Sequence, residues 1–382
     1  MASFEDGTEH PGPRPDSLDA VFELRETHRR GEHVLYVGES LVPERTLIRE
    51  VWPAFREAGY EVEAARTDPT GRDVLIARPI SPGIDGIPWT NLLLFVATLS
   101  TTLFVGATAW YYVPVHELLA NPLVALRAWP FVAAVLGVLL VHELGHYVAG
   151  RYHGVAVSLP YLIPFVVPFG TMGALIRIRG QLPDRKALFD VGVAGPLAGL
   201  VATVVVTVIG LSLPPQPVPQ SIVESTGEAV VFNDPPLLTL IGTLLGEQTS
   251  YADPSLTVHP VVVGGWVGMF FTLLNLLPVG QLDGGHILRA IVGPRQETIA
   301  ALVPLVLFGL AGYLHAVRGL GLNDSVALWL LWGLFATALA YNGPADPIDD
   351  EPLGRKRIAL GIVTFLLGAL CFMLVPVQVV TV

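Results

Sequence analysis

The sequence predicts a mainly α-helical, polytopic membrane protein, with a bundle of about seven spans, a re-entrant hairpin and a small N-terminal α/β soluble domain. Hydrophobic residues make up 52% of the 382 residues and charged residues only 14%, whereas soluble domains carry about 25% charged residues. Several apolar runs reach the roughly 20 residues that a helix needs to cross a bilayer. The first 82 residues have instead the mixed charge of a soluble domain.

Residues 1–82 are predicted to be a cytoplasmic α/β domain, regulatory because it contains no catalytic motif. Hydrophobic periodicity and turn residues place its elements: a short helix at 17–30, a strand at His33–Gly38, an amphipathic helix at Pro43–Gly59, and strands at Glu61–Thr67 and Asp73–Ile80 joined by a DPTG turn. Pro53 should kink or split the helix, because proline removes a backbone donor and clashes with the preceding turn. Residues 83–88 are a linker.

Residues 89–382 are predicted to form the membrane domain. Its seven expected spans lie at about 89–113, 128–150, 189–213, 260–280, 298–317, 325–342 and 357–379. Residues 155–180 are apolar but carry Pro160, Pro164 and Pro168, which would break a spanning helix. Non-helical backbone at membrane depth needs protein or a water-filled cavity beside it. We therefore expect a re-entrant hairpin there.

Charge predicts the orientation and excludes some functions. The connections after the second, fourth and sixth predicted spans are rich in arginine, whereas residues 214–258 contain no Lys or Arg. The positive-inside rule then predicts a multi-pass cell-membrane protein with its N-terminus in the cytoplasm. The net charge of −11 without a basic stripe argues against nucleic-acid partners. Cys371 is the only cysteine, which excludes intrachain disulfides and multi-cysteine zinc sites.

The second predicted span contains the sequence VLLVHELGHYVAG, with His142, Glu143 and His146. Histidines four residues apart project from one helix face, so both imidazoles can bind one metal ion. Glu143 lies beside them, where it can take a proton from water. Ionisable residues inside an apolar span are costly and usually mark function. This pattern predicts a catalytic metal site.

A third protein ligand is needed, because catalytic zinc usually has three protein ligands and water. The fourth predicted span ends in NLLPVGQLDGGH, which contains Asn275, Pro278 and Asp283. Asp283 is expected at the same membrane depth as His146, and Pro278 with the paired glycines should loosen the helix so that the carboxylate turns inward.

These motifs resemble the site-2 protease family of intramembrane metalloproteases (peptidase family M50): HELGH in one helix and N-x-x-P-x-x-x-x-D-G-G in a later one. GTMGALIRIRG and DRKALFDVGVAGPLAGL further resemble the subgroup of the plastid ethylene-dependent gravitropism-deficient and yellow-green proteins. The resemblance covers a catalytic core of about 128–295. It implies one Zn²⁺ per chain held by His142, His146 and Asp283, with Glu143 as general base and Asn275 near the scissile bond.

The implied activity is hydrolysis of peptide bonds in membrane-embedded protein substrates, within the lipid bilayer. We expect the substrate to unwind and pair as a strand in the region of Gly170 and Gly173, since extended peptides add readily to exposed strand edges. Two alternatives are a non-proteolytic transporter or metal-binding scaffold, which would not need Glu143, and a metalloprotease whose third ligand is a glutamate. No later span offers a well-placed glutamate.

Overall fold

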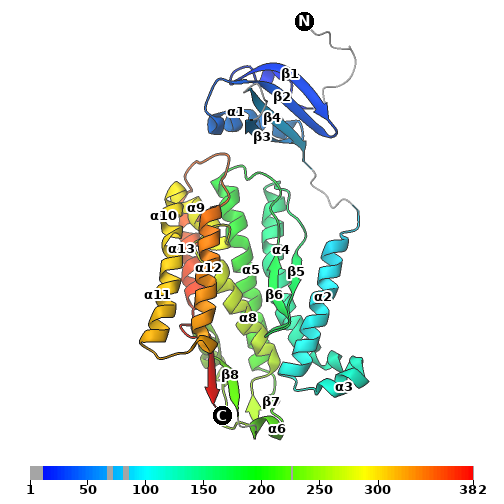
Figure 1. Ribbon diagram of the computed structural model, residues 1–382, viewed down its shortest axis with the longest axis vertical. Coiled ribbons are helices and arrows are strands. Elements are labelled where there is room, and N and C mark those ends of the chain that lie inside the picture. The colour runs from blue at the N-terminus through cyan, green and yellow to red at the C-terminus, as the bar shows by residue number, and fades with distance from the viewer. Residues whose placement is uncertain (1–11, 67–71, 81–85, 225–226, 382) are drawn as a thin grey trace.

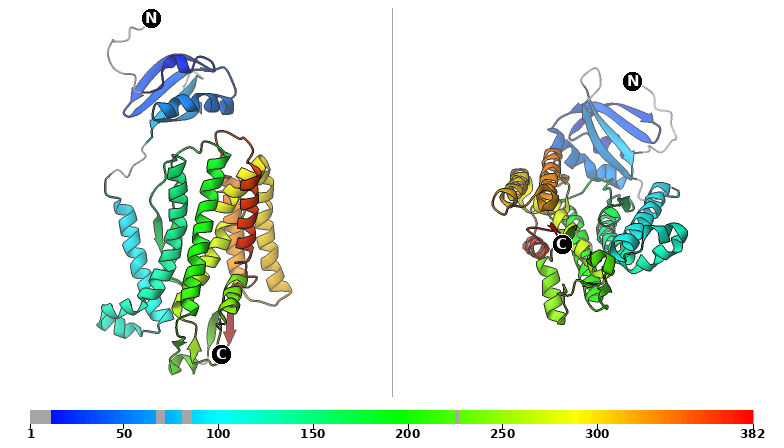
Figure 2. Two further views of the ribbon diagram at one scale, coloured as in Figure 1. Left: turned by 180° about the vertical axis from the view of Figure 1, so that it is seen from behind. Right: turned by 60° about the horizontal axis from the view of Figure 1, so that its bottom comes forward.

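The computed structural model describes residues 12–66, 72–80, 86–224 and 227–381. A soluble domain lies at one end of the long axis, and the helices of the membrane domain stand side by side below it (Figure 1). At the opposite end of the helices, which we call the distal end, lie β7, α6, β8 and the C-terminal strand β10 (Figures 1 and 2).

The soluble domain consists of β1 (Phe22–Arg30), β2 (His33–Ser40), α1 (Glu44–Glu57), β3 (Tyr60–Arg66) and β4 (Asp73–Pro79), after a short 3₁₀ turn at Pro15–Ser17. The four strands form an antiparallel sheet in the order β1-β2-β4-β3. Leu47, Val51 and Phe55 of α1 are buried in its core. The predicted DPTG turn, residues 68–71, lies outside the described residues.

The helix predicted at residues 17–30 was wrong. Residues 22–30 form β1 rather than part of a helix: Gly31, with φ +64°, reverses the chain, and β1 then pairs with β2 along its length. Pairing within a sheet overrides the helix propensity of the Glu- and Arg-rich run. Pro53 lies inside α1 without splitting it.

The membrane domain begins with α2 (Trp89–Val105), continued by a wider turn at Gly106–Trp110, then α3 (Val115–Ala120), a 3₁₀ segment at Pro122–Ala128, and α4 (Trp129–Tyr152). The hairpin β5 (Tyr161–Pro164) and β6 (Thr171–Leu175) precedes α5 (Arg185–Leu211). The distal segment contains β7 (Gln216–Pro217), α6 (Gln220–Val223), β8 (Glu228–Phe232), α7 (Pro236–Leu245) and β9 (Leu256–Thr257). The remaining elements are α8 (Pro260–Asn275), α9 (Asp283–Val292), a 3₁₀ turn at Gly293–Arg295, α10 (Gln296–Ala300), α11 (Leu302–Ala316), a wide turn at Leu322–Val326, α12 (Ala327–Asn342), α13 (Arg355–Ala369) and β10 (Val377–Thr381).

The seven predicted spans are not confirmed. In the part of the chain that is described, four helices are long and apolar enough to cross a membrane: Trp89–Trp110, Pro122–Tyr152, Arg185–Leu211 and Leu322–Asn342. A fifth span is possible if Asp283–Ala300 and Leu302–Ala316, bent by 51°, count together. The expected last span at 357–379 is helical only to Ala369, because the chain then turns and β10 pairs with β8.

α4, α5 and α8 pack against one another and form the centre of the membrane domain. Their starts are fixed locally: the Asp184 side chain accepts a hydrogen bond from the Ala187 amide at 2.7 Å, which caps α5, and Pro260 occupies the first turn of α8. The expected hairpin at 155–180 is present as β5 and β6. It lies between α2 and α4, with β5 packed on α2 and β6 on α4 (Figure 1).

The connection between α12 and α13 ties three elements together at the end nearest the soluble domain. Asp346 accepts hydrogen bonds from Arg289 of α9, with an Nη2–Oδ1 distance of 2.6 Å. Asp350 lies 2.6 Å from Nε of Arg185, in the first turn of α5. The Arg289 side chain is only 3% exposed, so its charge depends on this carboxylate for compensation.

We predict that Asp346→Ala destabilises the membrane domain. Removing one partner of a buried ion pair costs about 3–5 kcal/mol, and because the Asp346 side chain is 50% exposed we expect a smaller loss, about 1–3 kcal/mol. Thermal unfolding in detergent measures it. Glu351→Ala, at an exposed position of the same connection, is the control. Equal unfolding temperatures for the two variants would show that water already compensates the Arg289 charge.

Candidate metal centre

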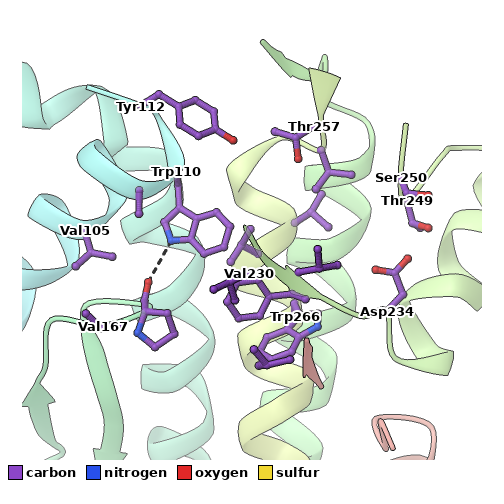
Figure 3. Close-up of a pocket in the computed structure, with 18 of the residues that line it drawn as sticks. Val105, Trp110, Tyr112, Val167, Val230, Asp234, Thr249, Ser250, Thr257 and Trp266 are labelled. Atoms are coloured by element: carbon purple, nitrogen blue, oxygen red, sulfur yellow. Dashed lines mark hydrogen bonds between the residues drawn. The ribbon is translucent and has the colours of Figure 1, made fainter. Parts of the chain in front are cut away.

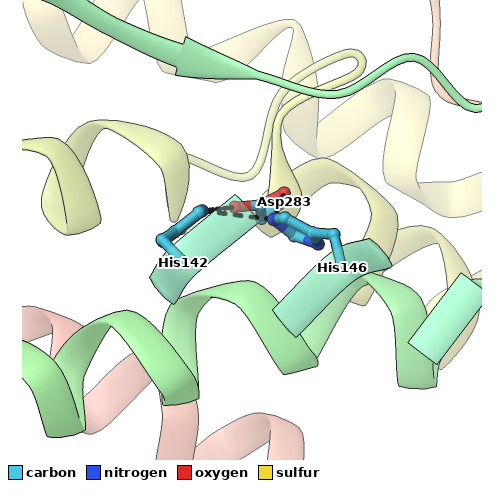
Figure 4. A group of neighbouring side chains, drawn as sticks. All are labelled: His142, His146 and Asp283. Atoms are coloured by element: carbon cyan, nitrogen blue, oxygen red, sulfur yellow. Dashed lines mark hydrogen bonds and ion pairs between the residues drawn. The ribbon is translucent and has the colours of Figure 1, made fainter. Parts of the chain in front are cut away.

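His142 and His146 lie one helical turn apart on α4, and both are buried. Their Nε2 atoms are 3.1 Å apart. The Asp283 carboxylate reaches both: Oδ2 lies 3.1 Å from Nε2 of His142, and Oδ1 lies 3.2 Å from Nε2 of His146. Figure 4 shows the two imidazoles converging on this carboxylate. The sequence-predicted ligand set is therefore brought together in space.

Asp283 reaches the histidines by a route that differs from the expected one. α8 ends at Asn275, the chain turns through Leu276–Leu282, and Asp283 is the first residue of α9 rather than the end of α8. The turn is tight enough to need the paired glycines. A Cβ on Gly284 would lie 2.1 Å from the Leu276 carbonyl oxygen, and one on Gly285 would lie 2.3 Å from that of Gly280.

This cluster fits a zinc ion. One ligand atom from each of the three residues lies within 4.8 Å of the others. Nitrogen and oxygen ligands about 2.0–2.1 Å from a tetrahedral zinc lie about 3.3 Å from one another, close to the separations in this cluster. Two imidazoles and one carboxylate are also a ligand set that leaves one position open, as catalytic zinc sites do.

Neighbouring groups on α5 orient the histidines. The Nδ1 atom of His146 lies 2.8 Å from the Val191 carbonyl oxygen; that oxygen can only accept, so Nδ1 carries the proton and Nε2 is free for a metal. Three glycines let the α5 backbone approach the site: a Cβ on Gly195 would lie 2.0 Å from Nε2 of His146, one on Gly199 would lie 2.8 Å from Nδ1 of His142, and one on Gly192 would lie 3.0 Å from Cβ of His286.

Glu143 and Asn275 lie at the same centre. Glu143 is buried, 5% exposed, and directly follows His142 in α4. The Asn275 amide nitrogen lies 3.3 Å from Nε2 of His142, so Asn275 adjoins a predicted ligand. His286, one turn after Asp283, is buried, and its Nε2 has no hydrogen-bond partner among the described protein groups.

Gly170 and Gly173 lie in the hairpin beside this centre. Both have positive φ, +83° and +114°. A Cβ on Gly170 would lie 2.3 Å from Cα of Thr102 in α2, and one on Gly173 would lie 3.1 Å from the Phe271 ring of α8. The glycines therefore let the hairpin approach α2 and α8 closely. β6 has a strand partner on only one edge, since it forms a two-stranded sheet with β5 alone in the described part of the chain.

Sequence reasoning missed the α2 side chains that hold β5 and the hairpin turn. The Asn91 amide donates to the carbonyl oxygens of Leu159 and Pro160, at 3.1 and 2.9 Å. The hydroxyls of Thr101 and Thr102 donate to the Gly170 carbonyl oxygen, at 2.7 and 3.2 Å. Polar side chains within an apolar span were the available signal. The Val191 carbonyl carried no signal in the sequence.

Residues 130–311 match the sequence model of the family described as Peptidase family M50. The match includes the whole cluster of His142, His146 and Asp283. Residues 130–311 belong to peptidase family M50. The two imidazoles and the carboxylate of this cluster are ligand types that zinc takes in proteins.

The chain is also similar to curated proteins that are named as probable metalloproteases. The chain is 35% identical over 238 residues to the probable zinc metalloprotease EGY1, chloroplastic, of Arabidopsis thaliana, an alignment covering 61% of this chain and 40% of the relative. It is 34% identical over 247 residues to the protein of the same name from Oryza sativa subsp. japonica, covering 64% and 40%. The chain thus spans about two fifths of the length of these relatives. A solved structure, the site-2 protease from Methanocaldococcus jannaschii, matches with 13% identity and a TM-score of 0.33 over 68% of this chain and 93% of that one, too low a similarity to support a conclusion.

We predict that Gly195→Ala lowers the zinc content of the M50 domain, because the added Cβ would displace Nε2 of His146. Elemental analysis of purified protein should fall from about one zinc per chain to well below it. Gly137→Ala in α4 is the matched control, since its Cβ would meet nothing within 4 Å. Full zinc occupancy in Gly195→Ala, with unchanged thermal unfolding, would remove His146 Nε2 from the ligand set.

Proposed function

We propose that the protein is a multi-pass intramembrane zinc metalloendopeptidase that hydrolyses peptide bonds of membrane-embedded protein substrates. The observation that carries this proposal is the convergence of His142, His146 and Asp283, with Glu143 beside them, inside the apolar helices of an M50 domain. His142, His146 and Asp283 would hold the zinc, which supplies Lewis-acid activation of water and of the scissile carbonyl.

The protein's own groups would carry out the remaining chemistry. Glu143 accepts a proton from the attacking water at its carboxylate and passes it to the leaving nitrogen, as a general base and then a general acid. The Asn275 amide donates a hydrogen bond toward the carbonyl oxygen as negative charge develops there. The hydrogen bond to the Val191 carbonyl holds His146 in one tautomer throughout.

The substrate must expose its scissile bond, because the peptide bonds of a helix are covered by its own hydrogen bonds. β6, whose second edge lacks a strand partner in the described part of the chain, is the strand of the hairpin that packs on α4, and α4 carries Glu143. A substrate segment that adds to this edge would be extended beside the metal centre. Gly170 and Gly173, which let the hairpin approach α2 and α8 closely, belong to this substrate-strand region.

We further infer that the soluble domain lies in the cytoplasm and regulates cleavage. The arginine-rich connections on its side of the bundle and the Lys- and Arg-free segment 214–258 at the distal end support this orientation. Contacts of the soluble domain with the segments before and after the hairpin support regulation. Gln181 exchanges hydrogen bonds with the Val62 backbone of the edge strand β3, and Arg56 donates to the Gly154 carbonyl oxygen.

We predict that Glu143→Gln lowers the cleavage rate about 100- to 10,000-fold while zinc stays bound, since it removes only the proton acceptor. Asp283→Ala should lower both zinc content and cleavage. The two readouts are zinc per chain and the appearance of substrate fragments on gels. Undiminished cleavage by Glu143→Gln would contradict the proposed mechanism, and full zinc content in Asp283→Ala would contradict the ligand set.

We predict that Gly173→Val slows cleavage without releasing zinc, because its side chain would press on Phe271 and displace β6. Two matched substrates test whether unwinding is the barrier: one with Gly or Pro beside the cut and one with leucine at the same positions. The first should be cleaved faster, since exposed backbone groups in hydrocarbon cost several kcal/mol each. Equal rates for both substrates would leave the hairpin without a role in unwinding.

A further inference from the structure

A cavity of about 940 Å³ lies at the distal end, away from the metal centre and not assigned to the proposed reaction. Its walls come from the end of α2, the turn of the β5–β6 hairpin, strand β8 and the first turns of α8 (Figure 3). We propose that this cavity binds the part of the substrate that continues from the hairpin toward the distal end, and selects segments that are apolar and not acidic. This inference rests on the proposed protease function.

The lining of the cavity is mostly apolar. Trp110 packs against Phe232, with ring centroids 5.6 Å apart, and Phe232 packs against Trp266 at 5.2 Å. The two indole N–H groups already have partners: Trp110 donates to the Pro168 carbonyl oxygen at 3.3 Å, and Trp266 to that of Asn233 at 2.8 Å. The rings therefore present carbon surfaces, which favour apolar side chains.

The cavity is continuous with the proposed substrate strand. Val166, Val167 and Pro168, in the turn that joins β5 to β6, form part of its wall. The hydrogen bond from Trp110 to Pro168 fixes this turn to the cavity. A peptide that follows the edge of β6 past Thr171 would therefore enter the cavity directly.

Helix α8 gives the distance between the two sites. Trp266 lines the cavity, and Asn275, which contacts His142, lies nine residues later in the same helix. Nine residues of α-helix rise about 13 Å, and an extended strand covers that distance in about four residues. The cavity should therefore receive side chains about four to six residues from the scissile bond, on its distal side.

Strand β8 adds a polar edge for an extended peptide. It pairs only with β10 in the described part of the chain. Val230 and Val231, which line the cavity, are 57% and 41% exposed. An extended substrate segment can thus satisfy its backbone groups on β8 while its side chains enter the cavity.

Charge decides which segments fit. None of the described residues that line the cavity is Lys or Arg, and Asp234 is one of them. The segment 212–259 carries five acidic residues and no Lys or Arg: Glu224, Glu228, Asp234, Glu247 and Asp253. An acidic substrate side chain would have to leave water for an apolar cavity without a cation, near like charge, whereas an apolar side chain gains by burial.

The test scans one residue through a substrate that is cleaved by the full chain in detergent. Glu, with Gln as the matched control, is placed at each position from one to ten residues beyond the cut on the distal side. We expect Glu at positions four to six to raise KM at least about tenfold over Gln, equivalent to about 1.4 kcal/mol, with little change in kcat. Glu at positions eight to ten should have no such effect. A flat profile across all positions would overturn the proposal.

Introducing a charge of either sign at one position of the cavity gives opposite expected effects, which misfolding alone would not produce. Val231→Arg should restore cleavage of the substrates with Glu at positions four to six, and Val231→Asp should weaken it further. Leu245→Arg, at an exposed position outside the cavity lining, is the control and should leave the profile unchanged. An unchanged Glu profile in Val231→Arg would show that a lipid or nothing occupies the cavity, and would overturn the proposal.

The outcomes separate this inference from the proposed function. Cleavage of the Gln parent substrate by the unaltered chain and its loss in Glu143→Gln support the protease function alone. If the parent is cleaved but the Glu scan is flat, only the cavity proposal fails. If the parent is never cleaved by zinc-loaded protein, the protease function fails and the cavity proposal fails with it.

Discussion

The close approach of α5 to the two histidines of α4 is the constraint on which the rest of the site depends. Gly195 and Gly199 leave no room for a Cβ against the imidazoles, and the Val191 carbonyl accepts the hydrogen bond that fixes His146. This contact fixes the orientation of the two imidazoles inside an apolar helix, so that their Nε2 atoms can serve as metal ligands. The geometry of the proposed metal site thus depends on the close approach of the α5 backbone as much as on the proposed ligands themselves. Since Asp283 arrives from a different helix, its position then has to be fixed separately.

The position of Asp283 is fixed by interactions at both ends of α9. Its first residue is Asp283, delivered by a turn that only the paired glycines permit. Near its other end, Arg289 is buried and pairs with Asp346, which also lies 3.4 Å from Arg45 of the soluble domain. Arg185, in the first turn of α5, is paired with Asp350 of the same connection. The α12–α13 connection therefore links both helices that flank the metal centre, and it offers a physical path from the soluble domain to Asp283.

The sequence predicted the centre of the protein better than its periphery, for physical reasons. The i, i+4 histidines, the proline series at 160–168 and the N-x-x-P spacing have few structural solutions, so the ligand cluster and the hairpin could be foreseen. β1 could not, because Phe22–Arg30 is charged enough to favour a helix and becomes a strand only by pairing with β2. The predicted span at 357–379 failed similarly: its last residues are apolar, but β8 offers them a strand edge. In both segments the secondary structure depends on pairing with a distant strand, and a hydropathy pattern contains no information about which strands will pair.

The hairpin offers a way for one chain to hold the proposed buried metal site and also to admit the extended substrate that we propose. The side chains of Asn91, Thr101 and Thr102 on α2 bond to carbonyl groups at the start of β5 and in the hairpin turn, so that side of the hairpin is satisfied by the protein itself. The other edge, on β6, has no strand partner in the described part of the chain. Unpaired backbone groups at membrane depth are costly, so this edge gains most when a peptide pairs with it. The two ends of β6 also differ. Its C-terminal end leads to the segment before α5, and its N-terminal end begins at the hairpin turn, which the hydrogen bond from Trp110 holds beside the distal cavity. A peptide paired with β6 would therefore extend toward that cavity. Binding energy from the distal cavity would then be available to offset the unwinding of the substrate at the metal centre, which is the step that a helical substrate resists.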